Sequence, residues 1–181
     1  MNLDDIRLDS AIRQKKGVHF ILASVFIWSA VLVVHLMDLP ILTKNLITFV
    51  FTAPLLPLAY LFSKFLKIDF TSAGNPLTNL GVIFSLNQML YLLIAMWVYP
   101  TVPEKMVMVL AMIFGAHLLP FGWLYQSKAY IALSVIIPIA ALMVGVNFQP
   151  FAVAAMMVVI ELIFSLLLFL EVSKLSSVKK A

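Results

Sequence analysis

One acidic residue lies alone in the middle of a long apolar segment. Glu161 is about ten residues from either end of the apolar run over 151–172, which places it about 15 Å from each end of a helix. That depth is the midplane of a bilayer whose hydrocarbon core is about 30 Å thick. Ionisable side chains at this depth are rare and mark proton or substrate sites. We predict a functional, protonatable carboxyl at Glu161; the alternative is a protonated Glu that only helps helices to pack.

Four further polar side chains fall at a similar depth in two other apolar segments. Asn87 and Gln88 lie about eight residues from one end of their run, and His117 lies about eight residues from the corresponding end of its own. All three are then about 12 Å deep, within about one helical turn of Glu161. Tyr91 forms an i,i+4 pair with Asn87. We predict that these residues line one ligand- or proton-binding site, although small and amide side chains also act as packing contacts between membrane helices.

A second, smaller candidate lies near the other end of the first apolar run. Ser24, Trp28 and His35 recur at helical spacing there, and Asp38 follows His35 at i+3. An i,i+3 His–Asp pair is able to bind a cation or respond to pH. The competing interpretation is an interfacial salt bridge.

The residues that would support catalysis do not converge. The chain has three His and no Cys, and His19 and His35 are about 24 Å apart along one helix, too far to share a zinc ion whose Zn–N bonds are about 2 Å. No HExxH, GxSxG, P-loop or GxGxxG pattern is present. We therefore expect no enzyme, no metal and no cofactor, with an intramembrane acid–base enzyme using Glu161 and His117 as the remaining alternative.

The composition indicates the environment that must hold these side chains. Of 181 residues, 64% are hydrophobic and 11% are charged, whereas a soluble domain is about half apolar and about a quarter charged. Such a chain needs lipid as its solvent. The net charge of +4 reflects basic residues at helix ends, so we expect no nucleic acid partner.

Six apolar runs predict an all-α, polytopic fold with six transmembrane helices. A cytoplasmic N-terminal segment over 1–16 precedes a transmembrane domain over 17–172, and a basic cytoplasmic tail over 173–181 follows it. Pro54 and Pro57 predict a kink in the second helix, and Gly115 and Gly122 predict a face for close helix approach. The predicted helices cover residues 17–37, 46–66, 80–99, 104–124, 129–146 and 151–172.

The distribution of Lys and Arg predicts the orientation in the membrane. With six spans and a cytoplasmic N-terminus, ten basic residues fall on the cytoplasmic side, and only Lys44 and Lys105 fall outside. The positive-inside rule then places both termini in the cytoplasm. The ten cytoplasmic residues are Arg7, Arg13, Lys15, Lys16, Lys64, Lys67, Lys128, Lys174, Lys179 and Lys180.

Two segments carry a resemblance to a known family. NPLTNLGVIFSLNQMLY over residues 75–91 and GAHLLPFGWLYQSKAY over 115–130 resemble the NPL…LG…NQ…Y and GAH…P…W-Y…Y segments of an uncharacterised family of small six-helix bacterial integral membrane proteins, a domain of unknown function. The resemblance extends over nearly the whole chain and implies six helices but no activity. It draws attention to Asn75, Trp123 and Tyr125 as well as to the polar residues above.

These observations favour a transporter or ligand-binding membrane protein with a polar intramembrane cavity around Glu161 and His117. The alternative is a non-catalytic membrane subunit or accessory protein of a larger complex. We expect a multi-pass protein of the bacterial plasma membrane whose partners are the lipid bilayer and a small molecule or proton. A homo-oligomer or a larger complex is compatible with the sequence.

Overall fold

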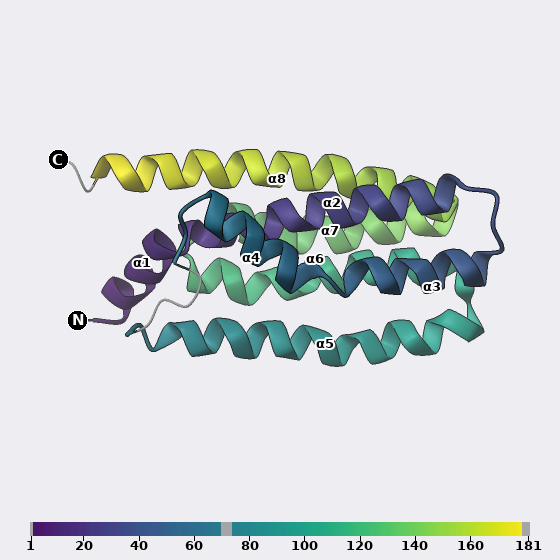
Figure 1. Ribbon diagram of the computed structural model, residues 1–181, viewed down its shortest axis with the longest axis horizontal. Helices are drawn as coiled ribbons and strands as arrows, with labels where there is room; N and C mark the ends of the chain where they lie inside the picture. Colours follow the sequence, from purple (N-terminus) through teal and green to yellow (C-terminus); the bar gives the residue numbers. More distant parts are fainter. Residues whose placement is uncertain (1, 70–73, 179–181) are drawn as a thin grey trace.

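The computed structural model describes residues 2–69 and 74–178, except for the side chains of residues 82 and 176–178. Every regular element in these ranges is a helix, which confirms the predicted all-α fold. The helices lie side by side along the long axis of the molecule (Figure 1). In chain order they are α1 (Leu3–Arg13), η1 (Lys15–Gly17), α2 (Val18–Leu36), α3 (Ile41–Thr52), α4 (Leu55–Phe65), α5 (Leu77–Thr101), η2 (Pro103–Lys105), α6 (Met106–Leu124), α7 (Lys128–Asn147) and α8 (Pro150–Val178).

Several helices have the length and composition of membrane spans. Five helical segments of the described chain are long and apolar enough to cross a bilayer, and the bent pair of α3 and α4 would add a sixth if it crosses as one span. The five segments are Lys15–Leu36, Leu77–Thr101, Pro103–Leu124, Lys128–Asn147 and Pro150–Leu175. Each carries one of the predicted apolar runs.

The break between α3 and α4 confirms the predicted kink. The two helices meet at an angle of 42°. Pro54 has no N–H to donate to the carbonyl of Val50, and Pro57 has none for the carbonyl of Ala53, so two hydrogen bonds of a continuous helix are missing here.

Several helix ends differ from the limits that hydropathy predicts. Helix α3 begins at Ile41 rather than at residue 46: the backbone N–H of Lys44 donates to the Pro40 carbonyl, and the polar residues 43–45 lie inside the helix. Helix α8 continues to Val178, so the predicted tail over 173–181 begins inside a helix. Polar residues continue a helix where it leaves the hydrocarbon core, and a hydropathy boundary misses them.

Close packing of α6 on α7 confirms the prediction from Gly115 and Gly122. A Cβ atom at Gly115 would lie 2.6 Å from Pro138 Cδ and 2.7 Å from Ile137 Cγ2, and one at Gly122 would lie 2.7 Å from Ile131 Cγ1. The two helices approach so closely only because these positions carry no side chain. Helix α2 packs along α8 in the other main helix pair.

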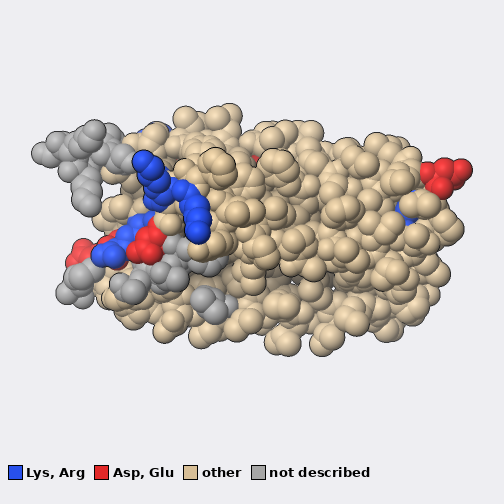
Figure 2. All heavy atoms as spheres, viewed as in Figure 1, with Lys and Arg blue, Asp and Glu red and all other residues tan. Residues whose placement is uncertain are grey.

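Charged side chains gather at the two ends of the bundle. On the face shown in Figure 2, Lys, Arg, Asp and Glu lie at the ends, and an uncharged belt separates them. Helix α1 and the C-terminal end of α8 lie at the same end (Figure 1). This end also carries the α4–α5 and α6–α7 connections, so the up-and-down topology collects most of the basic residues there.

Candidate functional site

Glu161 lies inside the bundle rather than against lipid. Its side chain is 0% exposed on α8, and its Oε2 atom lies 2.5 Å from the hydroxyl of Ser24 on α2. Within the described residues, its other carboxyl oxygen, Oε1, has no hydrogen-bond partner. The central acid of the sequence therefore lies between α2 and α8, the helices that pack along each other.

The hydrogen bonds around Ser24 indicate the protonation state of this carboxyl. The Ser24 hydroxyl lies 2.8 Å from the Ile21 carbonyl as well as 2.5 Å from Glu161, but a serine has only one hydrogen to donate. Both bonds form if Glu161 is neutral, since its O–H then donates to Ser24 and Ser24 donates to Ile21. An ionised carboxylate at this position would also need a cation, because burying one unpaired costs several kcal/mol. The described residues place none against it.

Small and apolar residues that are themselves buried flank Glu161 along α8. Ala154 is 0% exposed and Ser165 is buried on the same face of α8. The Ser165 hydroxyl donates to the backbone carbonyl of Glu161. Met157 and Phe164, about one turn away on either side along α8, are also fully buried.

His117 lies on another helix and is bonded within it. Its Nδ1 atom is 2.5 Å from the Phe114 carbonyl, so this nitrogen carries the hydrogen and donates it. The ring also packs edge-on against Phe114 and Phe121. Among the described residues, the structure does not bring His117 into contact with Glu161. His117 on α6 and Glu161 on α8 lie at a similar depth along their helices, but their side chains do not meet.

The predicted amide group lies on α5. Asn87 Nδ2 donates to Tyr91 Oη at 3.0 Å, which confirms the i,i+4 pair. Asn87 and Tyr91 are exposed on the helix surface, and Gln88 is half-buried. Within the described part of the chain, none of the three contacts Glu161, so they form a separate polar spot.

The predicted His35–Asp38 pair is replaced by a different contact. His35 is buried and its Nε2 atom lies 3.2 Å from the Thr48 hydroxyl on α3. Helix α2 ends at Leu36, so Asp38 lies beyond the helix and is exposed. The i,i+3 argument fails here because it requires both residues to be helical.

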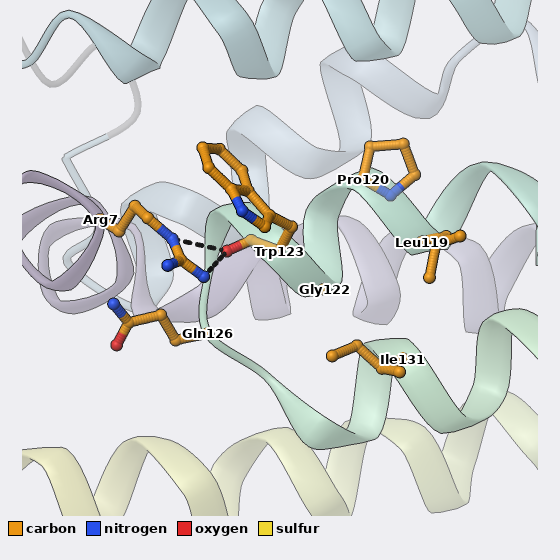
Figure 3. A pocket seen from close by; sticks show the side chains of 7 residues that line it. All are labelled: Arg7, Leu119, Pro120, Gly122, Trp123, Gln126 and Ile131. Carbon is orange, nitrogen blue, oxygen red and sulfur yellow. Dashed lines mark hydrogen bonds between the residues drawn. The ribbon is translucent and has the colours of Figure 1, made fainter. Parts of the chain in front are cut away.

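The N-terminal helix α1 is bonded to the end of the bundle. Arg7 Nε and Nη2 donate to the Trp123 carbonyl at 3.0 and 2.6 Å (Figure 3). Asn75 Nδ2 donates to the Ile6 carbonyl at 3.0 Å and to Asp9 Oδ2 at 2.9 Å. Two of the residues marked by the family resemblance, Asn75 and Trp123, thus hold α1 in place.

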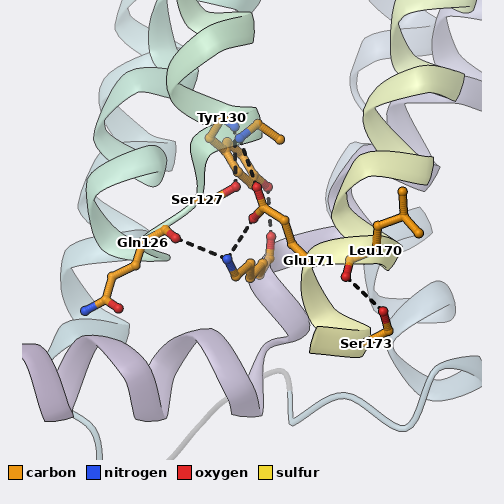
Figure 4. A network of polar contacts seen from close by, with 8 residues as sticks. Gln126, Ser127, Tyr130, Leu170, Glu171 and Ser173 are labelled. Carbon is orange, nitrogen blue, oxygen red and sulfur yellow. Dashed lines mark hydrogen bonds and ion pairs between the residues drawn. The ribbon is translucent and has the colours of Figure 1, made fainter. Parts of the chain in front are cut away.

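A buried ion pair joins the start of α2 to the end of α8. Lys16 Nζ lies 2.7 Å from Glu171 Oε2, and their side chains are 6% and 22% exposed. The other Glu171 oxygen, Oε1, accepts from the backbone N–H of Ala129 at 3.0 Å, and Lys16 also donates to the Gln126 carbonyl (Figure 4). Tyr130 Oη donates to the Lys16 carbonyl at 3.0 Å. Four segments of the chain therefore meet at one charged pair.

The backbone at this junction is held in an unfavourable conformation. Lys15, Lys16 and Gly17 have φ values of 44°, 51° and 70°, and for a non-glycine residue the left-handed region costs about 1–2 kcal/mol. A Cβ at Gly17 would lie 3.0 Å from Tyr130 Oη and 3.1 Å from Tyr125 Cε2, so both the positive φ and the tight space favour Gly there. In the sequence, Lys15 and Lys16 indicated only which end of the helix faces the cytoplasm. The ion pair between Lys16 and Glu171 was therefore not predicted.

Tyr125, the third residue marked by the family resemblance, supports the same junction. Its hydroxyl donates to Gln14 Oε1 at 2.6 Å, and its ring packs on Tyr130. Burial raises the pKa of the Tyr125 hydroxyl because the charged phenolate loses its hydration. Tyr125 is therefore a neutral hydrogen-bond donor at this end of the bundle.

Comparison with known proteins yields a family and no further relative. A family model described as a family of unknown function (DUF7010) matches residues 3–171. No curated protein and no solved structure matches the chain. In the described residues, no group of three or more His, Cys, Asp or Glu side chains is placed to hold a metal ion.

Proposed function

We propose that this protein, which belongs to the DUF7010 family, is a proton-coupled transporter or ligand-binding protein of the bacterial plasma membrane with Glu161 as its protonatable group. The observation that carries the proposal is the fully buried carboxyl bonded to Ser24, with one oxygen lacking a partner among the described residues. A buried ionisable group at mid-span is a feature of proton and substrate pathways.

The proposed topology has six spans and cytoplasmic termini. The bent pair of α3 and α4 would be the second span. The basic residues of α1 and η1 and Lys128 at the start of α7 lie at one end of the bundle, and Lys44 and Lys105 lie at the other. The positive-inside rule favours the more basic end as the cytoplasmic one.

The proposed site differs from the predicted one in its members. Ser24 is the hydrogen-bond partner of Glu161, and His117, Asn87 and Gln88 lie apart from it. Binding of a proton needs only Glu161 and Ser24. Entry of a ligand requires α2 and α8 to separate, because the carboxyl is enclosed between them.

Infrared spectroscopy tests the protonation part of the proposal. Purified protein in lipid vesicles at neutral pH should show a protonated-carboxyl stretch that Glu161→Gln removes. Glu104→Gln is a matched control, since Glu104 lies in η2 at the end of the bundle. A spectrum in which Glu161→Gln changes nothing would refute a neutral carboxyl.

Electrical measurement on the same vesicles tests the coupling part. A panel of amino acids, organic cations and small carboxylates is applied to vesicles on a solid-supported membrane. A compound that drives proton-coupled current in the wild type should drive none through Glu161→Gln, while Glu104→Gln should behave as the wild type does. Equal currents through both variants would rule out proton coupling at Glu161.

One observation favours the second candidate, a membrane subunit of a larger complex. Asn87 and Tyr91 are exposed near the middle of α5, about 15 Å from its start. An amide facing lipid at that depth is costly, and a partner helix would satisfy it. Purification in mild detergent with mass spectrometry of the bound proteins tests this role, and a lone monomer would contradict it.

A further inference from the structure

An apolar groove lies on the outer surface where α6 meets α7. Its volume is about 510 Å³. Leu119, Trp123 and Ile131 are 51%, 42% and 47% exposed there, so the groove faces the lipid. Gly122, where α6 approaches α7 closely, forms part of its wall between Trp123 and Ile131 (Figure 3).

One end of this groove is polar. Arg7 and Gln126 lie at the end of α6, whereas Leu119 and Pro120 lie farther along the helix (Figure 3). Residues 119 and 126 are separated by about 10 Å along the helix. The groove therefore runs from the membrane interface, where Trp and Arg side chains concentrate, into the apolar part of the span.

Arg7 is fixed at the polar end with donors to spare. Three of its five N–H groups donate, two to the Trp123 carbonyl and one to Asp4. Its guanidinium carbon lies 4.6 Å from the centroid of the Trp123 ring. Asp4 is 75% exposed, and an ion pair that exposed contributes little stability, so Asp4 competes for Arg7 but another anion is able to displace it. The side chain is thus held in place while two N–H groups remain without a partner among the described residues.

We infer that this groove binds an anionic phospholipid, with an acyl chain along Leu119 and Ile131 and the phosphate on Arg7. The groove has the two parts that such a lipid needs, an apolar channel at membrane depth and a guanidinium at headgroup depth. The surrounding end of the bundle is basic, with Lys67 in the α4–α5 connection and Lys128 at the start of α7, which favours anionic over zwitterionic lipid. The inference is independent of Glu161, which lies between other helices.

Quenching of Trp123 fluorescence by brominated lipid tests the inference. Trp28→Phe and Trp97→Phe leave Trp123 as the single tryptophan in the full chain. In phosphatidylcholine vesicles, brominated phosphatidylglycerol should quench Trp123 at a mole fraction roughly fivefold lower than brominated phosphatidylcholine does, the ratio expected from one arginine contact. Equal quenching by the two lipids overturns the proposal.

Two pairs of variants separate the groove from general charge. Arg7→Gln should remove the preference, and Arg13→Gln should keep it, since Arg13 is on the same helix and also forms an ion pair there, with Asp9, but does not line the groove. Asp4→Asn should strengthen the preference, because it removes the anion that competes for Arg7; this variant guards against a loss caused by misfolding of Arg7→Gln. An equal loss in both arginine variants, or no gain in Asp4→Asn, also overturns the proposal.

Discussion

The bond between Ser24 and Glu161 predicts a specific pattern of stabilities in a double-mutant cycle. Ser24→Ala leaves a buried carboxyl without a partner, which should lower the free energy of unfolding by about 1–3 kcal/mol. Glu161→Met replaces the carboxyl by an apolar side chain of similar length. With both changes made, neither polar group remains to be satisfied, so the double variant should be close to the wild type. The coupling energy should be about 1–2 kcal/mol.

Unfolding by SDS in mixed micelles, followed by tryptophan fluorescence, measures this cycle. Ser165→Ala is the matched control, because Ser165 is buried on the same face of α8 but donates to a backbone carbonyl. It should cost less than about 1 kcal/mol. Additive effects of Ser24→Ala and Glu161→Met, with no coupling, would refute the assignment of Ser24 as the partner that stabilises this carboxyl.

Three further variants test other parts of the structure in the same unfolding assay. Gly115→Ala should destabilise by about 1–2 kcal/mol, because its Cβ would overlap Pro138 and Ile137 of α7, whereas Gly81→Ala, whose nearest contact is 3.4 Å away, should be neutral or slightly stabilising; equal effects would contradict the close approach of α6 and α7. Lys16→Met should cost about 1–3 kcal/mol by leaving Glu171 unpaired, and adding Glu171→Met should recover most of it; no recovery would argue against the ion pair. Lys67→Gly should stabilise by up to about 1 kcal/mol, since residue 67 has a φ of 52°, and a loss of stability would contradict the left-handed turn after α4.

The effects of the prolines, the glycines and the mid-span acid are local, so they could be predicted from the sequence. Pro54 and Pro57 lack the N–H groups that a continuous helix requires, so the break between α3 and α4 follows from covalent structure alone. Gly115 and Gly122 are seven residues apart, so they lie on one face of any helix that contains them. Burial of Glu161 followed from its depth, because an acid in contact with lipid is too costly.

Side-chain contacts between helices could not be predicted from the sequence in the same way. Depth along a helix depends only on residue number, whereas the direction of a side chain depends on how each helix is rotated against its neighbours. His117 and Glu161 share a depth, yet His117 bonds to the Phe114 carbonyl and Glu161 to Ser24. His35 contacts Thr48 rather than Asp38, because α2 ends at Leu36 and Asp38 lies beyond the helix.

By itself, then, the sequence determined an all-α fold whose helices are long and apolar enough to span a membrane, with a kinked second segment and one acid that must be buried. These properties depend on local composition and on the period of a helix. Only the tertiary structure decided that Ser24 is the partner of that acid and that Lys16 meets Glu171, a pair separated by 155 residues in the chain. Such pairs depend on which helices pack together and on their rotation, and in a mostly apolar chain many rotations bury similar amounts of surface.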